Sequence, residues 1–163
     1  MTMMGSWSGM RKFLEQEMLA SSLRGRIRYS CITYPSMDGW HCFGIHIDGQ
    51  PYKYFSGESV AKSAYDGRKP FDSQRFWHGY WETIKSMPLS ERQEYDDEEF
   101  AGALRQYRSL PIGDALVSCN PLVRMFAILD RRVGKRTLAR QNLLAQPPWL
   151  QGLYQLRMDA EHI

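Results

Sequence analysis

The chain has 163 residues, of which 43% are hydrophobic, so it is long enough to bury a continuous core, and we predict a single domain over residues 1–163. Charged residues make up 24% and the formal net charge is +3, which excludes a disordered chain and a protein that is basic over its whole surface. The three cysteines, Cys31, Cys42 and Cys119, are odd in number and widely spaced, which is typical of reduced thiols in a cytoplasmic protein.

The start of the chain, "MTMMGSWSGMRKFLEQEM", has neither the continuous apolar segment nor the small-residue cleavage site of a secretory signal. No apolar run approaches the roughly 20 residues that a membrane-spanning helix needs. We therefore expect a soluble protein that does not associate with membranes. The first predicted element is an amphipathic helix that packs on a sheet, because large apolar residues recur at spacings of three and four, namely Trp7, Met10, Leu14 and Met18.

Three strands are predicted next. The segments "RIRYSCITY" and "WHCFGIHI" alternate with period two, and the second places Phe43 and Ile45 on one face. A tight turn at Asp48 and Gly49 leads into "QPYKYF", so the three strands should form an antiparallel meander. Pro51 cannot donate a hydrogen bond to a neighbouring strand, and the third strand should therefore lie at an edge of the sheet.

The initial helix and the meander occupy about residues 6–56, and about residues 58–161 are predicted to be helical. The segment "DSQRFWHGYWETIKSM" has a capping residue before an unusually aromatic helix face, which we interpret as core: Phe76, Trp77, Tyr80, Trp81 and Ile84. Farther on, four acidic residues at 96–99 precede the apolar positions of another helix. Carboxylates stabilise a helix N-terminus, so this cluster indicates a helix start, while a partner-binding role for it stays open.

Asn120 and Pro121 indicate the start of the next helix, because the Asn side chain can cap free amides and proline fits the first helical position. Gly134 indicates its end, since glycine adopts a left-handed cap without penalty. A second helix is predicted from about residue 136 or 137 to residue 145. A third should begin at "QPPW" and carry three residues on its inner side, Trp149, Leu153 and Met158.

The basic part of the chain covers most of the first of these predicted helices, the turn at Gly134 and the start of the second helix. Residues 124–140 carry a net charge of +5, which leaves −2 for the rest. At about 100° per residue, Leu122, Phe126, Leu129 and Val133 fall on one side of a helix and the arginines on the other. The candidate binding surface consists of Arg124, Arg131, Arg132, Lys135, Arg136 and Arg140. Asp130 is expected to form a surface ion pair with Lys135 or Arg136, of little energetic value.

Three interpretations of this basic segment remain open. The first is an amphipathic helical hairpin whose basic face is only solvated. The second is a helix-turn-helix that reads base edges through residues 140–142. Against it stand Asp130, where such a motif has a small residue, and Arg140, where it has an apolar one. The third is a sequence-independent contact with nucleic-acid phosphates, which needs only a cluster of positive charges on one surface.

Catalytic and metal-binding motifs are weak in this sequence. A metal site could use His41, Cys42 and His46, but His41 points away from the other two in a strand, so His78 or Cys119 would have to complete the set. No local motif supports a cysteine nucleophile with a histidine base, and no phosphate loop or GxSxG motif occurs. We predict no catalytic residue, no metal and no cofactor, and a protein that is not an enzyme.

Two blocks carry a resemblance to known sequences. They are "WSGMRKFLEQEMLASSLRGRIRYSC", residues 7–31, and "NPLVRMFAILDRRVGKRTL", residues 120–138. They resemble the two ends of a family of small uncharacterised bacterial proteins, which opens with a Trp-Ser helix leading into "RGR" and a strand and closes with an "NP…RMFA.LDRR.GKR.L" block. The resemblance implies a compact bacterial protein in which the second block is a defining element. It implies no activity and no site residue.

These patterns predict an α+β domain with an N-terminal helix, a three-stranded antiparallel sheet and a helical C-terminal half packed on one face of the sheet. For the function we favour a non-enzymatic domain that binds another protein through an aromatic and arginine-rich surface, since Trp, Tyr and Arg dominate interface energetics. The alternative is sequence-independent binding of a nucleic-acid backbone through residues 124–140. Neither hypothesis fixes the oligomeric state or the identity of the partner.

Overall fold

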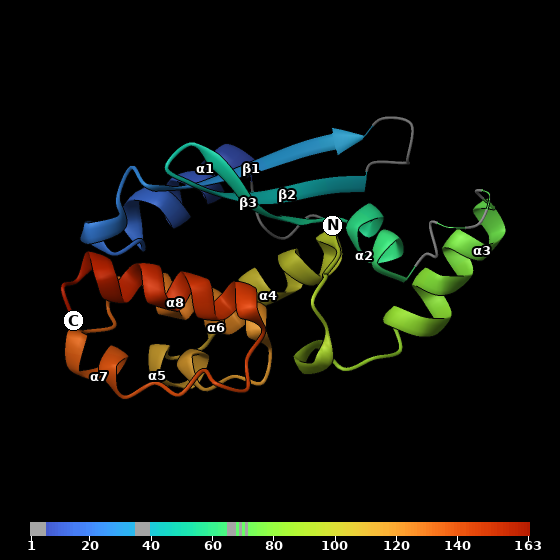
Figure 1. Cartoon of the computed structure of the whole chain (residues 1–163). Helices are drawn as coiled ribbons and strands as arrows, with labels where there is room; N and C mark the ends of the chain where they lie inside the picture. Colours follow the sequence, from blue (N-terminus) through green and yellow to red (C-terminus); the bar gives the residue numbers. More distant parts are fainter. Residues whose placement is uncertain (1–5, 35–39, 65–67, 69, 71) are drawn as a thin grey trace.

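The computed structural model describes residues 6–34, 40–64, 68, 70 and 72–163. Its sheet has three antiparallel strands in the order β1-β2-β3: β1 (Ile27–Tyr34), β2 (Trp40–Ile47) and β3 (Gln50–Phe55). The α-helices are α1 (Trp7–Lys12), α2 (Gly57–Ala64), α3 (Ser73–His78), α4 (Asp97–Ser109), α5 (Ile112–Leu116), α6 (Pro121–Leu129), α7 (Lys135–Ala139) and α8 (Pro148–Ala160). The helices α4, α6 and α8 lie on one side of the sheet (Figure 1). The predicted α+β class is confirmed.

Short π- and 3-10 segments extend or link these helices. They are η1 (Phe13–Glu17), η2 (Ser21–Leu23), η4 (Gly79–Ile84) and η5 (Leu89–Glu91). The first continues α1, so that Met10 and Leu14 both enter the core. The predicted N-terminal amphipathic helix is therefore present, and its second half is a π-helix.

The strands pair as their alternation predicts. In β1 and β2 the register runs from Ile27 opposite Ile47 to Ser30 opposite Gly44 and onward. Asp48 and Gly49 have φ values of 51° and 83°, which is the left-handed pair that a tight hairpin turn requires. The register of β2 with β3 shifts at a bulge opposite Pro51, and β3 is an edge strand, as predicted from that proline.

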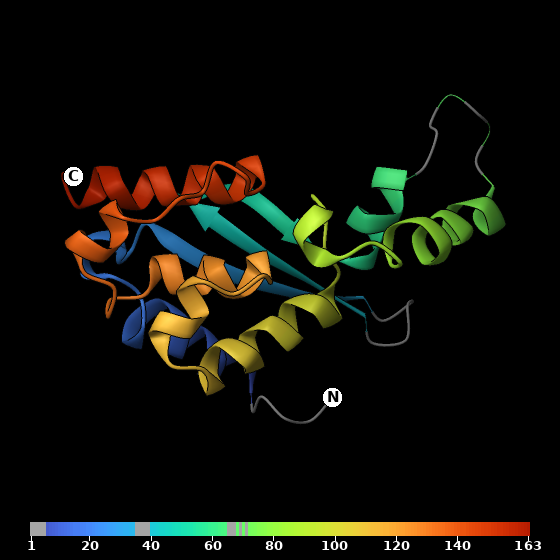
Figure 2. The same ribbon diagram turned by 90° about the horizontal axis from the view of Figure 1, so that it is seen from below.

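The centre of the core is α6, which lies between α4 and α8 and also packs against α5 (Figure 2). Every side chain of α6 is buried except that of Arg124, which is half-buried. The ring centroid of Phe126 lies 5.3 Å from that of Tyr107 and 5.5 Å from that of Phe100. A helix that is apolar all round must be buried, so the predicted amphipathic helix with one outward basic face is wrong for α6.

The aromatic helix predicted after residue 72 is split between α3 and η4. It lies beyond the end of the sheet together with α2 (Figure 1). Three of its side chains, Phe76, Trp77 and Ile84, pack against Val60 and Ala61 of α2 and form a small cluster separate from the main core. Trp81 is 56% exposed, so it is not the core residue that the sequence predicted. Tyr80 was also predicted on this aromatic face, but its side chain lies outside the described part of the structure.

Buried tyrosines make the stability of the fold sensitive to alkaline pH. Burial raises the pKa of Tyr95 to about 12 and raises the pKa values of Tyr29 and Tyr107 further. These phenols stay protonated in the folded state, while in the unfolded chain they ionise near pH 10. The stability they contribute is complete below pH 10 and is lost as the pH rises toward the folded pKa values.

We expect the free energy of unfolding to fall above about pH 10 by about 1.4 kcal/mol per pH unit for each of these tyrosines. Urea unfolding at a series of pH values, with phenolate absorbance recorded in parallel, measures this. A Tyr95→Phe variant should show a shallower fall. Equal slopes in the variant and the natural chain would contradict the assignment for Tyr95.

Candidate functional site

The basic segment begins with a helix that starts as predicted and ends earlier than predicted. Asn120 caps α6, accepting a hydrogen bond from the amide of Leu122 at 3.0 Å, and Pro121 is the first helical residue. The helix ends at Leu129. Gly134 has φ −82° and ψ 167° and is the N-terminal cap of α7, so the predicted left-handed C-terminal cap is wrong. Residues 130–134 form a turn, which we call the Asp130 turn.

The Asp130 turn is built around a carboxylate with no solvent exposure. Its oxygens accept hydrogen bonds from the hydroxyl of Tyr107, from the amide of Arg132 at 2.7 Å and from the guanidinium of Arg132 at 2.7 Å. The predicted ion pair with Lys135 or Arg136 is therefore wrong. A buried carboxylate with this many donors holds the turn in one conformation, because any donor that it loses leaves a buried charge unsatisfied.

A second buried charge approaches the same turn from α8. Arg157 donates hydrogen bonds to the carbonyls of Ile128 at 2.7 Å, Asp130 at 3.0 Å and Val133 at 2.7 Å. Burial lowers the pKa of Arg157, and its pair with Glu161 opposes that shift. This guanidinium satisfies carbonyls that the end of α6 leaves without helical partners. Of the three residues predicted on the inner side of α8, Leu153 is buried, and Trp149 and Met158 are partly buried and pack against the core. Arg157 is the buried residue that the prediction missed.

The N-terminal part of the chain also reaches the turn. Leu19 and Asp130 form an antiparallel bridge. The amide of Ala20 donates to the carbonyl of Leu129 at 2.9 Å, and the amide of Arg131 donates to the carbonyl of Met18 at 2.8 Å. The two sequence blocks that carry the family resemblance are thus in direct contact. The LDRR part of the second block is a packing element at its centre.

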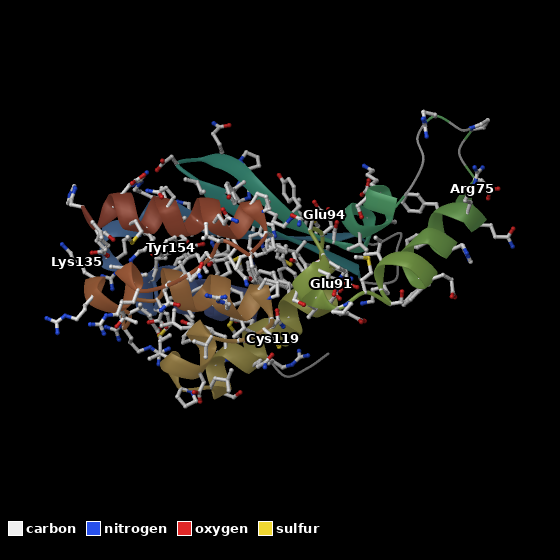
Figure 3. All side chains as sticks on the ribbon, turned by 60° about the horizontal axis from the view of Figure 1, so that its bottom comes forward. Arg75, Glu91, Glu94, Cys119, Lys135 and Tyr154 are labelled. Atoms are coloured by element: carbon white, nitrogen blue, oxygen red, sulfur yellow. The ribbon has the colours of Figure 1, made fainter. Side chains whose placement is uncertain are left out.

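The six predicted basic residues do not share one environment. Arg132 is held by Asp130, and Arg124 is half-buried with an Nε atom that has no hydrogen-bond partner. Burial lowers the pKa of Arg124. The other four are exposed, and no hydrogen bond or ion pair of their side chains occurs within the described chain; we call them the basic surface: Arg131, Lys135, Arg136 and Arg140. Figure 3 shows Lys135 at the end of the molecule that α7 forms.

The helix α7 that carries much of the basic surface is short. It spans Lys135–Ala139, whereas the sequence predicted a helix to residue 145. The side chain of Asn142 accepts a hydrogen bond from the amide of Leu144 at 3.1 Å, a local turn that competes with helix. The hydroxyl of Tyr154 donates to the carbonyl of Leu138 at 2.6 Å and fixes α7 on α8. The basic surface is therefore rigidly presented on one end of the fold.

The histidines and cysteines lie as strand alternation predicts. His41 is on the core side of β2, with its Nδ1 atom 3.1 Å from Thr33 Oγ1 and 3.8 Å from Cys31 Sγ, while Cys42 and His46 are on the opposite side. Burial raises the pKa of the Cys31 thiol, which disfavours the nucleophilic thiolate. Within the described residues, no three His, Cys, Asp or Glu side chains come together as a set of metal ligands.

The acidic cluster at 96–99 is largely engaged inside the fold. Asp96 and Glu99 form a capping box at the start of α4, with reciprocal hydrogen bonds of 2.8 and 2.9 Å. Lys85 Nζ lies 2.7 Å from a carboxylate oxygen of Asp96. Asp97 accepts a hydrogen bond from the amide of His41 at 3.0 Å, at a point beyond the end of β3. Most of the cluster therefore stabilises the start of α4 and its contact with the sheet, as expected for carboxylates at a helix N-terminus.

The side of the sheet away from the helices presents a second surface, which sequence analysis did not single out. We call it the outer face: Arg28, Ser30, Ile32, Cys42, Gly44, His46 and Tyr54. The ring of Tyr54 lies over Gly44, whose missing Cβ would stand 3.1 Å from it, and His46 meets the ring edge-on. Beside Tyr54 a hollow of about 300 Å³ opens, lined also by Ile32 and Cys42.

Comparison with known protein families matches residues 6–158 to one family over nearly the whole chain. The chain belongs to the SF0329 protein family. The matched residues include the two resembling blocks, the Asp130 turn and the segments that contact this turn. Comparisons with curated proteins and with solved structures find no match. No helix of the described residues has the length and apolarity that a bilayer crossing requires.

Proposed function

We propose that this member of the SF0329 family is a non-enzymatic domain that binds another protein in the bacterial cytoplasm. The observation that carries the proposal is the outer face of the sheet. It exposes 51% of Ile32 and 40% of Tyr54, while Cys42 is buried at 6%, where Glu58, Ser59 and Lys62 of α2 border the hollow. An antiparallel sheet commonly leaves one face to water, but that face is then polar. Adjacent exposed apolar and aromatic side chains instead favour a binding surface.

The composition of the outer face suits a protein partner. Tyr54 supplies an aromatic anchor, because its ring is packed closely against Gly44 and has little freedom to move. His46 and Ser30, whose side chains are 3.0 Å apart, add polar groups beside it. The hollow next to Tyr54 gives an apolar side chain of a partner a place to enter. The placement in the cytoplasm draws on the three cysteines, none of which forms a disulfide within the described residues.

The test is affinity purification from the native host with two matched variants. The outer-face variant is Ile32→Ser with Tyr54→Ser. The control is Val117→Ser with Leu144→Ser, which removes exposed apolar side chains (73% and 87%) elsewhere. A stoichiometric partner should be recovered with the natural chain and the control and be lost with the outer-face variant. Recovery with all three chains, or with none, would contradict the proposal.

Gly44 offers a sharper probe of the same face. An added Cβ atom would stand 2.7 Å from Ser30 Oγ and 3.1 Å from the Tyr54 ring. We expect Gly44→Ala to displace Tyr54, to weaken partner binding and to lower stability by about 1–3 kcal/mol. Gly113→Ala is the control, because a Cβ there meets open space in α5, and it should raise helix stability by up to about 1 kcal/mol. Unaltered binding by Gly44→Ala would show that Tyr54 is not an anchor.

A second candidate function is binding of a nucleic-acid backbone through the basic surface. The specific observation is that Arg131, Lys135, Arg136 and Arg140 are exposed without ion-pair partners in the described chain, so their charges are available to phosphates. The basic surface occupies a different end of the fold from Tyr54 and Ile32. The two candidate functions can therefore be tested separately.

Fluorescence anisotropy with labelled single-stranded and duplex DNA and RNA tests this second candidate. The variant Arg131→Gln with Lys135→Gln should weaken binding equally for all sequences and reduce the salt slope by about 0.9 for each phosphate contact in duplex DNA. The control Lys12→Gln with Lys62→Gln removes the same charge elsewhere. If the slope is unchanged in the first variant, or falls equally in the control, the basic surface is not the phosphate-binding site.

A further inference from the structure

The outer strand β1 has one edge that pairs with no other strand of the described residues. The amide of Tyr29 points toward this edge, because it donates to a carboxylate oxygen of Glu15 in η1 at 2.8 Å. Backbone groups of a strand alternate in direction with period two, so the amides of Cys31 and Thr33 also point toward the edge. Neither amide has a hydrogen-bond partner among the residues that the structure describes. Beyond Tyr29, this edge of β1 is unpaired within the part of the chain that the structure describes.

A groove lies beside residues 28–31 of β1 and reaches the unpaired edge at Cys31. It has a volume of about 490 Å³ and is lined from both faces of β1, by Trp7, Arg11, Arg28, Tyr29, Ser30, Cys31, His46 and Gly49. Trp7 and Cys31 belong to the core side of the strand, while Ser30 and His46 belong to the outer face. Figure 1 shows the final part of β1 extending past α1 with no ribbon above it. An extended chain placed along the edge would thus have room for side chains alternating above and below the sheet.

The charges around the groove select what can lie in it. Arg11 lies 3.0 Å and Arg28 lies 3.9 Å from the carboxylate of Glu15, which also accepts a hydrogen bond from the amide of Tyr29. Arg28 is 58% exposed and Arg11 is 46% exposed, while Glu15 is 11% exposed, so two exposed positive charges face one largely buried carboxylate. The rim is therefore positive. A second copy of this chain would bring an equally positive rim to the groove, which disfavours self-pairing relative to an acidic segment.

We propose that the free edge of β1 accepts an extended, acidic segment of the partner protein as a fourth strand of the sheet. The amides of Cys31 and Thr33 pair with the main chain of that segment, the groove receives its alternate side chains, and Arg28 pairs with an Asp or Glu in it. This rests on the proposed function and specifies how the partner is held. The outer face and the edge then form one continuous surface, since Ile32 lies between Cys31 and Thr33.

The experiment selects peptides from a displayed library of random dodecapeptides against the full chain. Enriched sequences should alternate apolar and polar residues and contain Asp or Glu. With a synthetic peptide of an enriched sequence, amide hydrogen exchange at Cys31 and Thr33 should slow by about tenfold or more. The amides of Ser30 and Ile32, which face β2, are the internal reference, because the sheet already protects them.

Thr33→Pro is the variant that isolates the edge. Proline removes the outward amide without removing a hydrogen bond to β2, and it should weaken the peptide by about tenfold or more. Thr33→Val is the matched control, because it loses the same hydroxyl contact with His41 and keeps the amide. Arg28→Gln is a second variant that does not alter the backbone, and it should weaken acidic peptides only.

Each other outcome overturns the strand-addition proposal. Absence of enriched peptides, unchanged exchange at Cys31 and Thr33, or equal affinities of Thr33→Pro and Thr33→Val would do so. Sedimentation that shows a dimer of the natural chain, lost in Thr33→Pro, would assign the edge to a second copy. The proposed function fails separately: a native partner that is lost with the outer-face variant and retained by Thr33→Pro leaves protein binding intact and removes strand addition.

Discussion

Replacing Asp130 by alanine is expected to lower the free energy of unfolding by about 3–5 kcal/mol, because the variant leaves buried donors without an acceptor. The hydroxyl of Tyr107 and the amide of Arg132 both donate to this carboxylate, whose side chain has no solvent exposure. Burial, and then the hydrogen bond to Asp130, hold the pKa of Tyr107 above its ordinary value, so its hydroxyl remains a donor at neutral pH. Equilibrium urea unfolding at neutral pH measures the loss.

The control for this variant is Asp159→Ala. Asp159 is exposed on α8, where it accepts a hydrogen bond from Gln155, so its loss should change stability by no more than about 0.5 kcal/mol. A loss below about 1 kcal/mol for Asp130→Ala would show that the Asp130 turn does not hold the fold. If that folded variant failed to bind a partner or a nucleic acid, the turn would be a binding element after all.

The second large effect is expected at Arg157. Replacement by methionine keeps the apolar stem and removes the guanidinium, leaving the carbonyls of Ile128, Asp130 and Val133 without that donor. We expect a loss of about 3–5 kcal/mol in unfolding free energy, since buried carbonyls cannot turn to water. Thermal and urea unfolding with circular dichroism measure it.

Arg157→Lys distinguishes the geometry of the guanidinium from its charge. An ammonium group keeps the positive charge but cannot reach three separate carbonyls in the fixed planar arrangement that arginine offers. The lysine variant should therefore recover only part of the stability lost in Arg157→Met. Full recovery by lysine would mean that charge alone matters, and equal losses would mean that charge contributes nothing.

The sheet was predictable because the signals that determine it are local. Period-two alternation assigned the faces of β1 and β2, the Asp48–Gly49 pair fixed the hairpin, and Pro51 placed β3 at an edge. The alternation also separated His41 from Cys42 and His46 correctly. No comparable local signal marked the outer face as a binding surface. The alternation within a strand separates two faces but does not show which of them the helices will cover.

The Asp130 turn was not predictable from helical periodicity. A helical wheel drawn over residues 122–133 assumes that the helix continues to residue 133. The side chain of Asp130 instead accepts a hydrogen bond from the amide of Arg132, and this local contact ends the helix. The sequence contained a signal for this helix end, because an aspartate side chain can accept a hydrogen bond from the amide two residues later. The contact of Arg157 with the turn had no such signal, because its partners there are main-chain carbonyls, which leave no trace in the sequence pattern.

The bridge between Leu19 and Asp130 joins parts of the chain that are about 110 residues apart, which makes it among the costliest loops to close during folding. The main-chain carbonyl of Asp130 also needs the guanidinium of Arg157, a residue close to the end of the described chain. A chain emerging from the ribosome therefore cannot complete this junction until almost all of it has been synthesised. Until then Leu19 and the apolar surface of α6 remain exposed to water and to chaperones.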